Sequence, residues 1–122
     1  MGTPTVLAYG FAGPSVKKLR GVCDKLGLRL RRVLPEEAGR SVGSFVGRGR
    51  PGDGETAPAE VGEMLVLCDV SECQLEVLLS SLRTARVGQD ALKAVFTDTN
   101  ARWTGSELYE ELQKERAELA RK

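Results

Sequence analysis

Apolar and polar positions divide this chain into two similar halves. Residues 5–9 (TVLAY) and 64–68 (MLVLC) are short, almost wholly apolar runs, which predict two buried β-strands. Residues 28–34 (LRLRRVL) and 92–96 (LKAVF) predict a further strand in each half. Between the strands, apolar residues recur at helical spacing, at Val16, Leu19, Cys23 and Leu26 in the first half and at Leu75, Leu78, Leu79 and Leu82 in the second. The chain therefore reads as two βαβ units, followed by a C-terminal helix.

Two helices of the second half begin with complete start signals. Ser71 with Gln74, and Thr104 with Glu107, have the spacing of a capping box, in which each side chain bonds the other residue's backbone N–H. Trp103, the only Trp of the chain, precedes the second box in the position of a hydrophobic staple.

Residues 28–34 begin with strict alternation of apolar and basic side chains. This pattern predicts a strand with one wet face at the edge of the sheet, where arginines also discourage edge-to-edge pairing. Beyond it, a glycine-rich connection spans about residues 39–60. We expect one weak helical turn at residues 41–46 and irregular chain at residues 48–54. The whole chain, residues 1–122, is predicted to form a single α/β domain.

Two architectures fit this order of elements. The first is a small three-layer α/β sandwich with a four-stranded, mostly parallel sheet in the order 2-1-3-4. The right-handed crossover rule then places the first two helices on opposite faces of that sheet. The second is a ferredoxin-like α+β fold, with antiparallel neighbours and both helices on one side. Both put residues 5–9 and 64–68 in the centre, and the continuous apolar runs there favour cover on both faces.

Composition excludes several classes of protein. With 122 residues, 41% hydrophobic and 29% charged, the chain has the balance of a globular domain, and its net charge of +1 makes nucleic acid an unfavoured partner. It has no apolar run long enough for a membrane span and no signal peptide, so we expect a cytoplasmic protein without membrane contact. The absence of His excludes Ser–His and Cys–His catalysis, and three Cys without a CxxC pair indicate neither zinc nor a disulfide scaffold. We expect no cofactor and no metal.

Polar residues follow three of the predicted strands. In a parallel sheet, Tyr9, Asp69 and the turn at residues 97–100 would gather at the carboxyl edge, where ligands of α/β proteins bind. Helix N-termini at Ser71 and Thr104 would point there too, which favours an anion. The opposing interpretation is that Asp, Thr and Asn here are ordinary turn and cap residues.

The run LKAVFTDTNARWTGSELYEEL, from residue 92, carries a K-A-x-x-T-x-T-N-x-x-W-T core followed by an L-x-x-E-L helix. It resembles the signature of DUF3783, a family of small bacterial domains. The YGF turn after the first strand and the segment MLVLCDVSECQLEVLLSSLR resemble the family as well. Asp69 stands where the family usually has Gly. The resemblance implies a domain identity without an activity, and it marks five candidate ligand-binding residues, Lys93, Thr97, Thr99, Asn100 and Trp103.

The function that we expect is a non-enzymatic binding or regulatory module. Its ligand would be a protein partner or a small anion at the strand carboxyl edge, and a homodimer is a further possibility. The alternative is a small enzyme that uses Asp69 and Asp98, with or without a metal ion.

Overall fold

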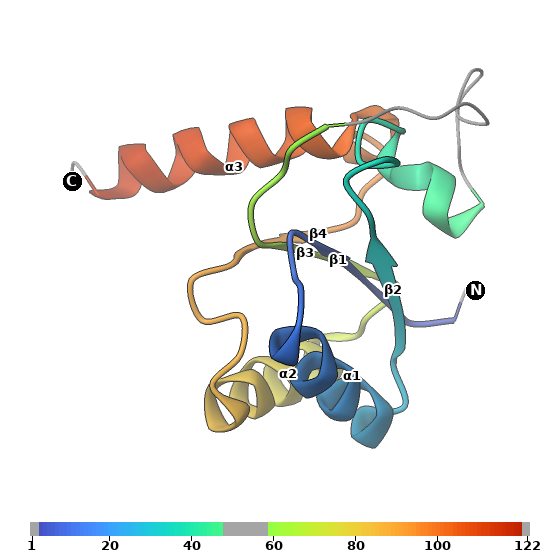
Figure 1. The fold of residues 1–122 in the computed structure, drawn as a ribbon, viewed down its shortest axis with the longest axis vertical. Helices are drawn as coiled ribbons and strands as arrows, with labels where there is room; N and C mark the ends of the chain where they lie inside the picture. Colours follow the sequence, from blue (N-terminus) through green and yellow to red (C-terminus); the bar gives the residue numbers. More distant parts are fainter. Residues whose placement is uncertain (1–2, 48–58, 121–122) are drawn as a thin grey trace.

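The computed structural model describes residues 3–47 and 59–120. Its elements alternate as the sequence predicts (Figure 1). In chain order they are β1 (Thr5–Tyr9), α1 (Pro14–Leu26), β2 (Arg29–Val33), the 3-10 helix η1 (Val42–Val46), β3 (Met64–Cys68), α2 (Glu72–Ala85), β4 (Leu92–Val95), the 3-10 helix η2 (Asn100–Arg102) and α3 (Gly105–Ala120). The predicted helical turn at residues 41–46 is confirmed as η1, whereas the irregular segment predicted at residues 48–54 lies outside the described residues.

The four strands form one sheet in the predicted order, β2-β1-β3-β4. β2 pairs with β1 in parallel, and β4 pairs with β3 in parallel. The two central strands are antiparallel, with Thr5 opposite Cys68 and Tyr9 opposite Met64. The three-layer α/β sandwich with a mostly parallel sheet is thus confirmed and the ferredoxin-like alternative is not, since two of the three strand pairs are parallel.

Helices α1 and α2 pack against each other on one face of the sheet, so their predicted placement on opposite faces is wrong (Figure 1). The physical reason is the antiparallel joint. An axis perpendicular to the sheet between β1 and β3 relates the two βαβ units, and rotation about it reverses strand direction without changing the face. Two right-handed crossovers related in this way carry their helices to the same side.

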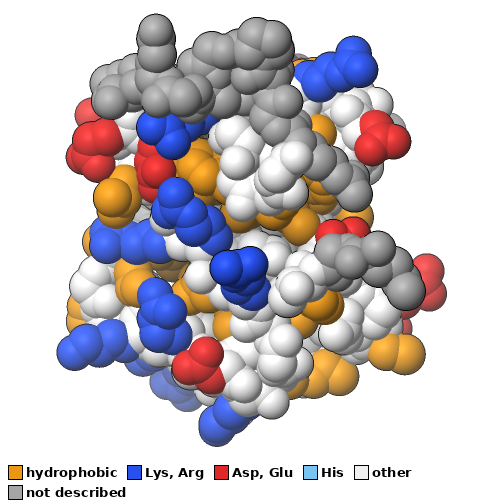
Figure 2. Space-filling model, turned by 90° about the vertical axis from the view of Figure 1, so that its right-hand side faces the viewer, with side chains coloured by type: hydrophobic (Ala, Val, Ile, Leu, Met, Phe, Trp, Pro, Cys, Tyr) orange, Lys and Arg blue, Asp and Glu red, His pale blue; other side chains and the backbone are white. Residues whose placement is uncertain are grey.

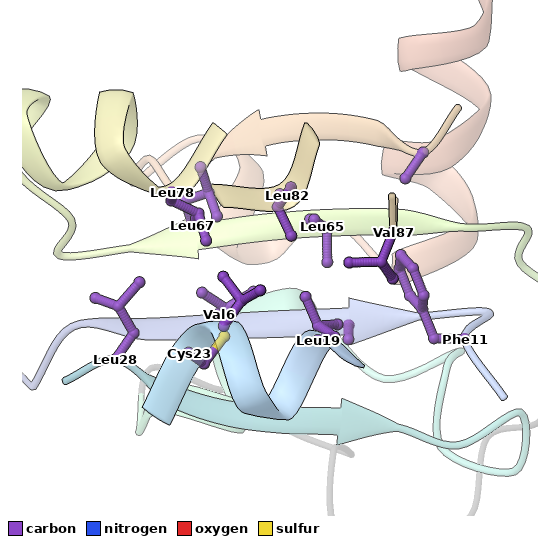
Figure 3. Packing of buried hydrophobic residues seen from close by; sticks show 13 residues of the cluster. Val6, Phe11, Leu19, Cys23, Leu28, Leu65, Leu67, Leu78, Leu82 and Val87 are labelled. Carbon is purple, nitrogen blue, oxygen red and sulfur yellow. The ribbon is translucent and has the colours of Figure 1, made fainter. Parts of the chain in front are cut away.

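Each face of the sheet has its own hydrophobic core. Between the sheet and α1/α2, side chains from both units interdigitate, among them Val6, Leu19, Leu65 and Leu78 (Figure 3). The opposite face is covered by α3, η1 and the chain that flanks them. Every residue of β1 and β3 is buried. The consecutive apolar positions of both runs therefore match a sheet that is covered on both faces.

Helix α3 approaches the sheet closely at its first residue. A Cβ atom added to Gly105 would lie 2.4 Å from Cε2 of the buried Tyr9 and 2.8 Å from the carbonyl oxygen of Ala38. The Gly105 N–H donates to that same carbonyl, at 3.2 Å. The absence of a side chain at Gly105 therefore lets α3 begin directly above Tyr9.

Two glycine-to-alanine substitutions should change stability in opposite directions. Gly105→Ala forces Tyr9 or the Ala38 backbone to move, so we expect a loss of about 1–3 kcal/mol in the free energy of unfolding. Gly21→Ala, within α1, meets no atom within 4 Å and should gain up to about 1 kcal/mol from helix propensity. Urea denaturation measures both values, and equal effects of the two substitutions would contradict the close approach at Gly105.

Candidate binding site at the β2 edge

The structure separates Tyr9 from Asp69 and from the turn at residues 97–100, which lie together at the other end of the sheet. Because β1 runs antiparallel to β3, Tyr9 lies at the end of the sheet opposite to Asp69 and to the turn at residues 97–100. The expectation that these residues gather at one carboxyl edge is wrong. Both central strands are apolar at nearly every position, so the sequence pattern contains no signal for their relative direction.

Thr97 and Asn100 are bonded to each other's backbone. The Thr97 N–H donates to Asn100 Oδ1 at 2.8 Å, and the Asn100 N–H donates to Thr97 Oγ1 at 3.1 Å. Asn100 Nδ2 also donates to the carbonyl of Val95 at 3.0 Å. Asn100 is 8% exposed, whereas Thr97 and Thr99 are exposed. This exchange of bonds ends β4, starts η2 and occupies a carbonyl at the end of the edge strand.

Lys93 and Trp103 also make internal bonds. Lys93 Nζ donates to the carbonyls of Gly88 at 3.0 Å and Ala91 at 3.2 Å, which ties the loop before β4 to the strand. Burial and the charge of Arg116 hold the pKa of Lys93 below its ordinary value, against the opposing effect of Asp90. Trp103 is half-buried in the core under α3, and its carbonyl accepts the N–H of Val42 at 2.8 Å.

The helix-start signals are confirmed. Ser71 Oγ accepts the N–H of Gln74, and Gln74 Oε1 accepts the N–H of Ser71. Thr104 and Glu107 make the equivalent pair of bonds at the start of α3, at 3.1 and 2.9 Å. The turn and cap bonds expected of residues 97–104 are thus present, and a ligand role of these residues stays a prediction.

Tyr9, the remaining candidate, is fully buried beside Phe45, with the two rings edge to face. Its hydroxyl has no hydrogen-bond partner among residues 3–47 and 59–120. Burial raises the pKa of Tyr9 well above its ordinary value, with further electrostatic contributions from Cys68 and Glu37. Tyr9 is therefore a neutral core residue.

The hydrogen bonds of Asn100 predict that its substitution lowers the stability of the fold, whereas substitution of its neighbour Thr99 does not. Asn100→Ala leaves the Thr97 N–H and the Val95 carbonyl without their partner, so we expect a loss of about 1–3 kcal/mol in the free energy of unfolding. The exposed Thr99 makes no side-chain bond to the described residues, and Thr99→Ala should change stability by less than about 0.5 kcal/mol. Denaturant melts of the two variants measure the difference. An Asn100→Ala variant as stable as Thr99→Ala would contradict the structural role of these bonds.

A pocket of about 490 Å³ lies elsewhere, where the amino ends of β1 and β2 meet the carboxyl end of β3. Arg29 and Arg31 project from β2 on the same side as Leu7, the side that faces η1. Asp69 stands at the β3 side of the pocket, and Phe45 of η1 lines it as well. We call this site the arginine pocket, lined by Thr3, Thr5, Arg29, Leu30, Arg31, Phe45, Val46, Gly47 and Asp69. The molecule is seen from the β2 side in Figure 2, where Lys and Arg side chains gather.

The two guanidinium groups of the arginine pocket differ in their surroundings. Arg31 donates to both carboxylate oxygens of Glu37, at 2.9 and 3.0 Å, and lies 5.2 Å from the ring centroid of Phe45. These contacts hold Arg31 in one orientation. Arg29 is exposed and forms no side-chain hydrogen bond or ion pair with the described residues. The arginine pocket thus combines one fixed cation with one cation that is available to a ligand.

Asp69 has a backbone conformation that suits glycine, with φ of 57°. Asp tolerates this left-handed region better than most residues do. Asp69 therefore occupies a position, in the turn that leads from β3 to α2, whose backbone conformation favours glycine. Asp69 is exposed and lines the arginine pocket, whereas Asp98 does not line it. Within residues 3–47 and 59–120, no group of three or more Cys, Asp or Glu side chains is placed to hold a metal ion.

The alternation in β2 predicted its edge position, but no motif in the sequence predicted the arginine pocket. A signal was present in the distribution of charge. Residues 3–47 contain eight basic and three acidic residues, whereas residues 59–119 contain six basic and twelve acidic ones. The net charge of +1 hides this asymmetry, which is the kind that indicates a charged interaction surface.

The fold and the pocket define a small α/β domain of two βαβ units, with a basic site at one edge of its sheet. A family model described as a domain of unknown function, DUF3783, matches residues 63–119. The predicted resemblance to the DUF3783 family is confirmed over this segment, which runs from β3 to α3. No curated protein and no solved structure matches the chain. In the described part of the chain, no helix is long and apolar enough to cross a membrane.

The ionised Glu37 should stabilise the fold in a pH-dependent way. Burial alone would raise the pKa of Glu37, but hydrogen bonds from Arg31 and from the Leu34 N–H, with the charges of Arg31 and Arg40, hold it below its ordinary value of 4.5. A folded-state pKa below the unfolded one means that this stabilisation is complete above pH 4.5 and is lost as the pH falls through the folded value.

Glu37→Gln should accordingly lower the free energy of unfolding at pH 7 by about 1–2 kcal/mol, a modest value because Arg31 is partly exposed. The difference from the unmodified protein should shrink as the pH falls below 4.5. Glu36→Gln, at an exposed neighbouring position, is the control and should behave as the unmodified protein does. Urea unfolding from pH 7 to pH 3 tests this, and a difference that stays constant over that range would exclude the linkage.

Proposed function

We propose that this domain is a non-enzymatic binding module of the bacterial cytoplasm and that the arginine pocket recognises a carboxylate group of a protein partner. The observation that carries the proposal is the contrast between the two arginines. Arg31 is fixed by Glu37 and Phe45, while Arg29 is exposed and without a side-chain partner among the described residues. A fixed guanidinium beside an available one is a favourable arrangement for an incoming carboxylate.

The charges around the pocket favour a protein segment over a small inorganic anion. Arg29 and Arg31 lie on the β2 side, and the carboxylate of Asp69 lies on the β3 side. Asp69 would repel phosphate, whereas it would accept a hydrogen bond from an N–H group. A peptide carries a carboxylate and N–H donors together, so it can satisfy both sides of the pocket.

The position of the site supports the same class of ligand. The arginine pocket lies beside the outermost strand of the sheet, and basic side chains continue along that side of the molecule (Figure 2). A long ligand can therefore extend beyond the pocket along β2. The strand carboxyl edge contributes to this proposal through Asp69, at the end of β3.

An NMR titration of the ¹⁵N-labelled domain with an acetylated hexaglutamate amide tests the proposal. We expect the amides of Thr5, Arg29, Arg31 and Asp69 to shift, and we expect inorganic phosphate at the same ionic strength to leave them unmoved. Arg29→Glu should weaken peptide binding at least tenfold, about 1.4 kcal/mol.

The control is Arg83→Glu, a charge-matched change at an exposed position of α2 in the other unit. It should leave the dissociation constant within twofold of that of the unmodified domain. The proposal fails if the peptide shifts the amides of residues 97–104 instead of the pocket, or if the two variants weaken binding equally.

A further inference from the structure

The outer edge of β2 has backbone groups that no described residue pairs. The Arg29 N–H donates to the carbonyl of Pro4, at 2.9 Å, and the strands are parallel and in register from Thr5–Arg29 to Tyr9–Val33. In such a ladder, alternate residues bond to the neighbouring strand. The backbone groups of Arg29, Arg31 and Val33 therefore face β1, and those of Leu30 and Arg32 point away from the sheet.

Side chains satisfy part of this edge and leave its middle open. The Arg32 carbonyl accepts from Arg31 at 2.6 Å, and the Leu34 N–H donates to Glu37 at 3.1 Å. No described residue bonds the N–H or the carbonyl of Leu30, or the N–H of Arg32. The unpaired groups thus form one continuous stretch, flanked on one side by the arginine pocket, which Leu30 also lines.

The side chains along this edge select for an acidic strand. Arg29 and Arg31 lie on the η1 face, and Leu30 and Arg32 lie on the α1 face. A strand added beside β2 would place alternate residues against the two exposed faces of this edge. Acidic residues opposite Arg29 and Arg31, separated by an apolar residue opposite Leu30, would match it in charge and in polarity.

The same charges disfavour a second copy of this chain. Two β2 edges would bring arginines opposite arginines, and the other sheet edge, β4, carries Lys93. Like charges directly opposite each other destabilise a strand pair, and basic residues on edge strands are a known protection against self-pairing. The charges of this edge therefore favour pairing with an acidic strand and disfavour pairing with a second copy of this chain.

We propose that the partner binds as an extended acidic segment, which adds a fifth strand to the sheet beside β2 and places a carboxylate on Arg29, next to the Glu37-paired Arg31. This inference rests on the function proposed above and adds the conformation of the ligand. Backbone bonds to Leu30 and Arg32 would supply affinity, and the alternation of acidic and apolar side chains would supply specificity.

Backbone methylation of a model peptide separates strand addition from charge attraction. The parent is an acetylated peptide amide with the sequence Glu-Val-Glu-Val-Glu. In one isomer the N–H groups of the Val residues are methylated, and in the other those of the Glu residues. Since one set of N–H groups faces β2 and the other faces solvent, we expect one isomer to lose binding at least tenfold while the other stays within threefold of the parent.

Calorimetric titration of the full domain measures the three affinities, with Arg29→Glu and Arg83→Glu as matched variants. If both isomers bind as the parent does, or both lose binding equally, strand addition is wrong, and the proposed function stands provided that the parent still depends on Arg29. If the parent does not bind, or binds independently of Arg29, the proposed function itself fails. An oligouridylate that binds more tightly than the parent through Arg29 would overturn both in favour of RNA.

Discussion

The antiparallel pairing of β1 with β3 is the constraint on which the rest of this structure depends. It joins two βαβ units side by side in one sheet with opposite strand directions. As a result, α1 and α2 share one face of the sheet and form one core with side chains from both units. The other face is then left for α3, η1 and their flanking chain to cover. The close approach of Gly105 to Tyr9 and the bond from Val42 to the Trp103 carbonyl both belong to that second layer. If β1 and β3 were parallel, the crossover rule would place α1 and α2 on opposite faces of the sheet, and each face would need other elements to complete its cover.

The same joint determines where a ligand can bind. It sends the carboxyl ends of the two units to opposite ends of the sheet, so the domain lacks the shared carboxyl edge that serves parallel α/β folds. It also separates two units of opposite charge. The basic unit ends in β2, where no described residue pairs the middle of the outer edge, and the arginine pocket lies beside it. In the acidic unit, Lys93 and Asn100 instead occupy carbonyls at the two ends of β4.

Much of the fold could be predicted from the sequence because local signals there agree with the tertiary structure. Apolar runs, helical spacing and two capping boxes identified the strands and helices. The continuous apolar runs of β1 and β3 also predicted their central position in the sheet, which their burial confirms. Strand direction could not be predicted, since an all-apolar strand has no distinct faces. The candidate site was harder to predict from the sequence than the fold. Thr97 and Asn100 were predicted as ligand residues because they are polar, but they bond to each other. Arg29 and Arg31 line a pocket only together with Phe45 and Asp69, which are distant from them in sequence.

The most direct test of this account is the pattern of Hα–Hα nuclear Overhauser effects between β1 and β3 in solution. Antiparallel neighbours bring alternate opposite Hα atoms close together, and parallel neighbours do not. The account predicts strong Hα–Hα contacts at alternate pairs of the register that runs from Thr5–Cys68 to Tyr9–Met64. Absence of these contacts, with Tyr9 found beside Cys68 instead, would contradict the joint, the shared face of α1 and α2, and the position of the arginine pocket.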